Sequence, residues 1–167
     1  MIAIKGGKVL TMGEAGNIEN GTILVEGEFI KAVGKEVDIP EGYRCIDASD
    51  QYICPGFIDG HTHIGLEEEI YRLEGDDVNE ISDPITPQLR ALDGINFVDL
   101  AFTDALRGGV TRSMCMPGSA NIIGGQAVFL KHLASSLGEM VYRQPWGLKA
   151  ALGENPKRVY AAQKKSP

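Results

Sequence analysis

The fold is decided by Tyr52-Ile53-Cys54-Pro55-Gly56-Phe57-Ile58-Asp59-Gly60-His61-Thr62-His63, an apolar run that leads through a Pro-Gly break into two histidines. Side chains two residues apart on an extended strand point to the same face, roughly 6.5 to 7 Å apart along the strand. His61 and His63 can therefore reach one metal ion at about 2.0–2.1 Å each, while Thr62 turns away. The stretch predicts a strand that ends in a metal site.

The composition is typical of a folded globular protein, with 43% hydrophobic and 23% charged residues among 167. A net charge of −7 argues against nucleic acid or an anionic membrane as a partner. No apolar run approaches the roughly 20 residues that cross a bilayer, and the first residues do not resemble a signal peptide, so we expect a cytoplasmic protein. The odd cysteine count, with Cys45, Cys54 and Cys115 at unpaired spacing, predicts small buried side chains rather than disulfides.

Two domains are predicted, at residues 1–51 and 52–167. Glycine and proline turn signals divide the first domain into short strands, which predict a small β-sheet module with a scaffold role. These strands are expected at Ile2–Lys5, Lys8–Thr11, Gly21–Glu26, Glu28–Gly34 and Tyr43–Asp47. Gln51–Ile58 is apolar without alternation, which is typical of a strand buried on both faces in a second, more central sheet.

The second domain begins with the pattern of a βαβ unit. After an acidic stretch, expected as a solvated loop, Asn96–Arg107 has the apolar spacing of a helix, and Gly108-Gly109 supplies its end. Val110–Met116 then predicts a second buried strand. A strand, a helix and a strand in this order imply a parallel sheet. Further strands are expected at Ala127–Lys131, Glu139–Val141 and Gly147–Leu152, with a helix at Lys157–Lys164.

Other candidate site residues lie near the predicted strand ends. Ser119, Asn121 and Gln126 belong to a polar, glycine-bearing loop at the carboxyl end of the second strand, where α/β barrels place their chemistry. They are candidates for substrate binding, with loop ordering as the alternative. Asp59 is expected to have a structural role at the strand end, next to the metal ligands, rather than to bind the metal itself. His132 has no partner at metal-ligand spacing and is expected to be an ordinary histidine.

The segment Pro55–His63, which follows a glycine-rich strand module ending in Asp47-Ala48, resembles the opening of the amidohydrolase superfamily, and in particular its imidazolonepropionase-like members. The resemblance extends over essentially the whole chain. Three further segments resemble the second barrel strand, the loop after it and a motif of the same subgroup: Gly108–Thr111, Met116–Asn121 with Gly124–Gln126, and Gly153–Arg158.

This resemblance implies an α/β fold in which a small β-sandwich module precedes the first strands and helices of a (β/α)8 TIM-type barrel. It implies a divalent metal, with zinc expected and iron, nickel or manganese as alternatives, held by His61 and His63. The implied activity is hydrolysis of carbon–nitrogen bonds of a small-molecule substrate through a metal-activated water. In the family the general base is an aspartate after the last barrel strand, and a lysine or acidic residue and later histidines add ligands. No residue of this chain is assigned as catalytic.

A complete barrel of this kind takes about 250 residues. About 115 residues remain from Ile53 to the end, which at roughly 30 per unit suffice for three or four of eight strands. We therefore expect the amino-terminal portion of a longer enzyme. The alternative is a non-catalytic fragment that associates through open sheet edges, either with itself as a homo-oligomer or with a missing carboxyl-terminal half.

Overall fold

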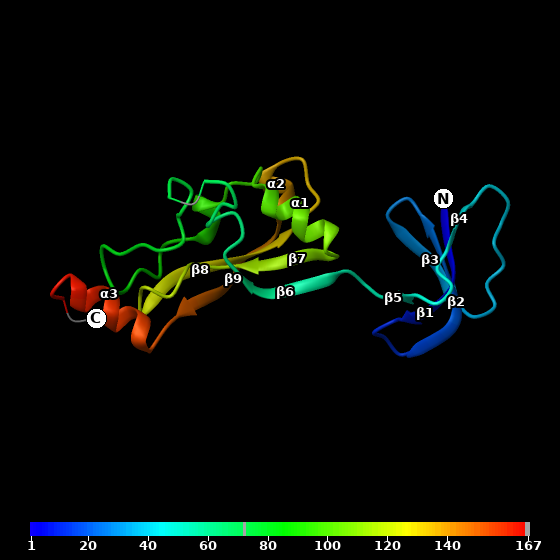
Figure 1. The fold of residues 1–167 in the computed structure, drawn as a ribbon, viewed down its shortest axis with the longest axis horizontal. Coiled ribbons are helices and arrows are strands. Elements are labelled where there is room, and N and C mark those ends of the chain that lie inside the picture. The colour runs from blue at the N-terminus through cyan, green and yellow to red at the C-terminus, as the bar shows by residue number, and fades with distance from the viewer. Residues whose placement is uncertain (72, 166–167) are drawn as a thin grey trace. The chain divides into compact units, whose positions relative to one another are not determined.

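The computed structural model describes residues 1–71 and 73–165 and divides the chain into two compact units, Met1–Pro55 and Gly56–Pro167 (Figure 1). The division falls a few residues after the predicted boundary at residue 51. Tyr52 and Ile53 explain the difference, because they pair with the first strand of the chain. Only the later part of the predicted strand Gln51–Ile58 joins the second sheet.

The first unit is a single five-stranded sheet, in the order β3-β2-β1-β4 with β5 also on β1. Its strands are β1 (Ile2–Leu10), β2 (Asn17–Glu26), β3 (Phe29–Gly34), β4 (Arg44–Asp47) and β5 (Tyr52–Ile53). The two predicted strands at the start of the chain are one strand, because Gly6 adopts a positive φ of 85° and the strand continues through it. The first half of β1 pairs with β4 and the second half with β5.

The described residues of this unit thus form one sheet, and the β-sandwich stays a prediction. A sandwich needs two sheets that face each other. Here β4 and β5 both return to the same edge of β1 and extend its sheet, so no second layer is formed from residues 1–55.

The second unit contains a four-stranded sheet in the order β6-β7-β8-β9. Its strands are β6 (Phe57–Thr62), β7 (Val110–Cys115), β8 (Ile123–Lys131) and β9 (Val141–Ala150). β6 and β7 are parallel and are joined through the short 3-10 helix η1 (Ala91–Gly94) and the helix α1 (Leu100–Arg107), so the predicted βαβ unit is confirmed. β8 and β9 are both antiparallel to their neighbours. The result is a mixed α/β sheet.

The elements after β7 differ from the predicted ones. The expected strand Ala127–Lys131 is the second half of the longer β8, and Gly147–Ala150 of the expected strand Gly147–Leu152 are the last part of β9. The expected strand Glu139–Val141 is instead the end of the helix α2 (Leu137–Met140) and the first residue of β9. A proline cannot donate to a strand ladder. The pairing of β9 with β8 shifts register around Pro145, which keeps the proline out of the ladder. The last helix, α3 (Glu154–Ala162), begins earlier than predicted.

The core of the second unit lies between the sheet and the helices α1 and α2, which cover one face of it (Figure 1). Asp99 starts α1 by accepting a hydrogen bond from Ala101 N, and Phe102 is the buried residue of that helix. Leu130 and Cys115 are fully buried beneath the helices. No helix in the described part of the chain is long and apolar enough to cross a membrane.

The expectation that all three cysteines are buried is wrong for two of them. Cys115 is buried, but Cys45 and Cys54 are exposed. Cys45 belongs to β4, whose residues are all exposed, and Cys54 follows β5 at the end of the first unit. Single apolar residues on such surfaces are common, so the sequence pattern could not distinguish the three.

We expect Leu130→Ala to lower the free energy of unfolding by about 2–5 kcal/mol, because it opens a cavity in a site with no exposed surface. Urea unfolding followed by circular dichroism measures the change. The matched control is Leu133→Ala, at a position that is 78% exposed, where we expect a change within about 0.5 kcal/mol. Equal losses for both variants would contradict the core described above.

Candidate functional site

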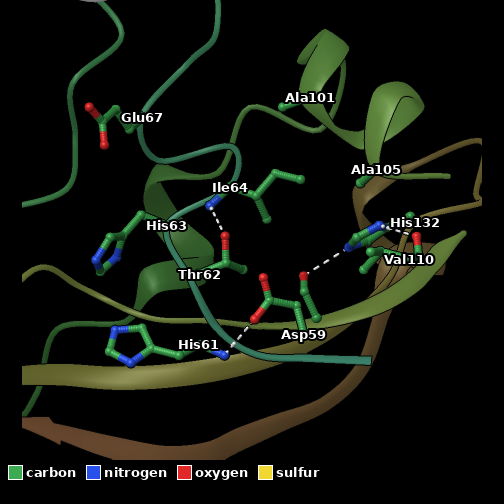
Figure 2. A pocket seen from close by; sticks show the side chains of 11 residues that line it. Asp59, His61, Thr62, His63, Ile64, Glu67, Ala101, Ala105, Val110 and His132 are labelled. Atoms are coloured by element: carbon green, nitrogen blue, oxygen red, sulfur yellow. Dashed lines mark hydrogen bonds between the residues drawn. The ribbon is translucent and has the colours of Figure 1, made fainter. Parts of the chain in front are cut away.

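The two histidines of the motif lie side by side where β6 ends (Figure 2). The ring centres of His61 and His63 are 5.6 Å apart and the ring planes are nearly perpendicular, at 87°. Two imidazoles bound to one tetrahedral ion at about 2.0–2.1 Å have ring centres roughly 5 to 5.5 Å apart. The observed separation is close to that value, so the rings are spaced as a shared ion requires, and their role as ligands stays a prediction.

The protonation of His63 is set by a backbone carbonyl. Its Nδ1 lies 2.7 Å from the carbonyl oxygen of Met116. Because a carbonyl only accepts, Nδ1 carries the hydrogen and the lone pair is left on Nε2. Histidines that bind metals usually give their other ring N–H to a carbonyl or carboxylate in this way. His63 is therefore prepared to act as a ligand through Nε2.

Asp59 supports the strand end next to these rings. Its Oδ1 accepts a hydrogen bond of 2.9 Å from the backbone N–H of His61, drawn as a dashed line in Figure 2. The pairing of β6 with β7 is irregular between Asp59 and Thr62. The carboxylate thus satisfies a backbone donor in a stretch where the ladder is interrupted. This contact agrees with a supporting role for Asp59, which remains a prediction.

A cavity of about 530 Å³ adjoins the strand end, and all three histidines of the chain line it (Figure 2). Asp59 and Glu67 also contribute to its wall. Among residues 1–71 and 73–165, no group of three or more histidine, cysteine or acidic side chains is close enough to hold one ion. The described residues thus offer a pair of imidazoles, which fits part of a metal site.

His132 contributes to the cavity as a structural residue. Its Nδ1 is 3.0 Å from the carbonyl oxygen of Val110, and its Nε2 is 2.8 Å from Ser113 Oγ. Nδ1 therefore donates and Nε2 accepts, and both nitrogens are used within the protein. Burial lowers the pKa of His132, while the Val110 carbonyl and the charge of Asp59 oppose that shift. Its contacts are those of the ordinary histidine that the sequence predicted.

Lys149 is a functional candidate that the sequence reasoning missed. It shares a second cavity, of about 270 Å³, with His61, and its Nζ donates a 3.0 Å hydrogen bond to the carbonyl oxygen of Pro117. Burial lowers the pKa of its ammonium group. A lysine within the otherwise apolar predicted strand Gly147–Leu152 was the signal that could have identified it.

The three polar residues proposed for substrate binding all make hydrogen bonds that order loops. Ser119 Oγ accepts from Asn155 Nδ2, and Gln126 Nε2 donates to the carbonyl oxygen of Pro87. Asn121 is buried and bonds to Tyr160 and Thr86. These contacts match the loop-ordering alternative, and direct contact of the three with substrate stays a prediction.

Comparisons with known proteins find relatives in sequence and in fold. The crystal structure of an amidohydrolase from Thermotoga maritima MSB8 is 40% identical, with a TM-score of 0.88 over 100% of this chain and 43% of that one. Amidohydrolase tasK of Hapsidospora irregularis is 35% identical over an alignment of 161 residues that covers 88% of this chain and 16% of that protein. An adenine deaminase from Moorella thermoacetica is 45% identical over 67 residues, covering 36% of this chain and 10% of its own length. No protein-family profile matches.

The relatives that match are named as hydrolases. The chain belongs to the amidohydrolase superfamily and corresponds to the amino-terminal part of its members. The chain spans less than half the length of the Thermotoga structure and a smaller share of the curated relatives. The imidazolonepropionase-like subgroup stays a prediction.

We expect the stability of the chain to fall between pH 7 and pH 5 in part because of His132. Burial lowers the pKa of His132 in the folded state. As the pH falls below the ordinary histidine value of about 6.5, the unfolded state is therefore protonated before the folded state, and the free energy of unfolding decreases. His132→Gln should make the free energy of unfolding less dependent on pH in this range. Urea unfolding at both pH values measures it, and equal pH dependence in the variant and the unsubstituted chain would refute it.

Proposed function

We propose that this chain is the amino-terminal part of a metal-dependent amidohydrolase that cleaves carbon–nitrogen bonds of a small molecule with a metal-activated water. The observation that carries the proposal is the hydrogen bond of His63, which lies beside His61 and donates its Nδ1–H to the carbonyl oxygen of Met116. That arrangement leaves Nε2 free for an ion. The names of the relatives, which include amidohydrolase, dihydroorotase and adenine deaminase, support the same chemistry.

We further infer that β6, α1 and β7 are the first elements of a (β/α)8 barrel. The parallel pairing of β6 with β7 supports this reading, because parallel strands joined through a helix are the repeating unit of such barrels. The likeness to the Thermotoga amidohydrolase over the whole chain also supports it. The carboxyl end of β6, where the histidines lie, is the end at which barrels place their active sites.

Zinc suits two imidazole ligands best, and iron, nickel or manganese are alternatives. When bound, the metal would supply Lewis-acid activation of the water and of the bond to be cleaved. His61 and His63 would hold it, Asp59 keeps the backbone at His61 in place, and Met116 fixes the ring of His63. Lys149 shares a cavity with His61, but its Nζ donates to the Pro117 carbonyl, so the ligands that the described residues offer are the two imidazoles.

A second candidate function is association without catalysis, through the open edges of the second sheet. The observation that favours it is the exposure of apolar residues on both edge strands, with Phe57 and Ile58 on β6 and Leu148 on β9 all more than half exposed. Exposed strand edges pair readily with other chains. The partner would be a second copy or a chain that supplies further barrel strands. Sedimentation of the isolated chain separates the two candidates, because a monomer that binds metal favours the first.

We expect the isolated chain to bind Zn²⁺ weakly and to lose it on dialysis, because two imidazoles are fewer ligands than the three or four of stable zinc sites. His61→Ala or His63→Ala should each weaken binding by more than about tenfold, since even the loss of a supporting residue costs that much. Isothermal titration with Zn²⁺ measures the affinities.

The matched control for this titration is His132→Gln, which removes a histidine of the same cavity whose nitrogens are already used. It should leave zinc affinity unchanged. Zinc that survives dialysis in stoichiometric amount would contradict the two-ligand site. An unchanged affinity in His63→Ala would contradict the proposed function.

A further inference from the structure

The loop Met116–Asn121 holds two side chains of the proposed metal site at its beginning. The carbonyl of Met116 accepts from His63 Nδ1 at 2.7 Å, and the carbonyl of Pro117 accepts from Lys149 Nζ at 3.0 Å. These two carbonyls are neighbours in the chain. A movement of this part of the loop would therefore displace the acceptors of both side chains together.

The other end of the same loop is fixed by a buried relay of hydrogen bonds. The hydroxyl of Tyr160 donates to Asn121 Oδ1 at 2.6 Å, and Asn121 Nδ2 donates to Thr86 Oγ1 at 2.9 Å. Thr86 Oγ1 in turn donates to the carbonyl of Ile123 at 3.1 Å. All three side chains of the relay are at most 3% exposed. Each side chain in the relay donates to the next group, so all of these hydrogen bonds are made in only one orientation of the three side chains.

The residues between the two ends make the loop stiff. Pro117 has a fixed φ. Gly118 N donates to the carbonyl of Val78 at 2.8 Å, and Ala120 N donates to Asn79 Oδ1 at 3.0 Å. Gly118 lies so close to the Asn79 side chain that a Cβ there would overlap it. Pro117, Gly118 and Ala120 thus leave the loop little freedom between Asn121 and Met116, so its two ends are held as one rigid segment.

We propose that Tyr160 and Asn121 are positioning residues for the site, which through this loop set the ring of His63 and the amine of Lys149. The inference rests on the proposed function, in which His63 is a ligand. Tyr160 belongs to α3, so the last helix described in the chain acts on the site that lies at the end of β6. Neither positioning residue touches the histidines in any hydrogen bond described above.

The test uses Tyr160→Phe in a chain labelled with ¹⁵N-histidine and free of metal. Phenylalanine fills the same space but leaves Asn121 Oδ1 without its donor. The chain has only three histidines, so the imidazole nitrogens of each can be assigned by NMR. In the unsubstituted chain His63 and His132 should both carry hydrogen on Nδ1. In the variant, the Nδ1–H to Nε2–H ratio of His63 should fall by at most about fivefold, the factor for complete loss of its hydrogen bond to Met116.

His132 is the reference within the same spectrum, because its partners Val110 and Ser113 lie outside the loop. Its tautomer should not change. Thr86→Val, which removes the acceptor of Asn121 Nδ2, should shift His63 in the same direction as Tyr160→Phe. Tyr142→Phe, at a position that is 58% exposed, should have no effect.

An unchanged His63 tautomer in Tyr160→Phe would overturn the proposal. A change of all three histidines together would also overturn it, because it would make Tyr160 a residue of general stability. The measurement is made without metal, so it is independent of the zinc titration. Absence of zinc binding would refute the proposed function, whereas the effect of Tyr160 on His63 is decided by the NMR measurement alone.

Discussion

The hydrogen bond from His63 to the Met116 carbonyl is the contact on which the candidate site depends. It requires β7 to lie beside β6, and a hydrogen bond from Met116 N to Thr62 O ties the two strand ends together. Cys115, the residue before, donates its Sγ–H to the carbonyl of Ile64. The segment that contains His63 is therefore held on both sides by Cys115, the last residue of β7, and by Met116 after it, and its ring faces a fixed acceptor.

Parallel pairing of β6 and β7 is in turn a consequence of the helix that joins them. Two parallel strands need a long crossover, and α1 provides it while burying Phe102 against the sheet. The antiparallel β8 and β9 then occupy the other side of β7. This arrangement leaves β6 at one edge and β9 at the other, with apolar residues exposed on both.

Three polar residues after β7, two in the loop and Gln126 in β8, are bonded within the protein, although their sequence pattern resembles that of a binding site. Ser119, Asn121 and Gln126 are polar, clustered and near the active end, which are the features expected of substrate contacts. In the structure each one is bonded to another segment of the chain. A buried asparagine costs free energy unless every polar atom has a partner, and Asn121 meets that need through Tyr160 and Thr86. The partners lie 35 and 39 residues away in the chain, so no local pattern reveals them.

The sequence by itself determined the strand that ends in His61 and His63, the helix and strand that follow it, and the superfamily. These features are local: a period of two on a strand, a period near four on a helix, and a motif of nine residues. Only the tertiary structure decided that β8 and β9 run antiparallel, that the first unit is one sheet, that Lys149 shares a cavity with His61, and that Tyr160 bonds to Asn121. Those outcomes depend on which distant segments pack together and satisfy one another's buried polar groups, a condition set by the whole fold rather than by any single stretch of residues.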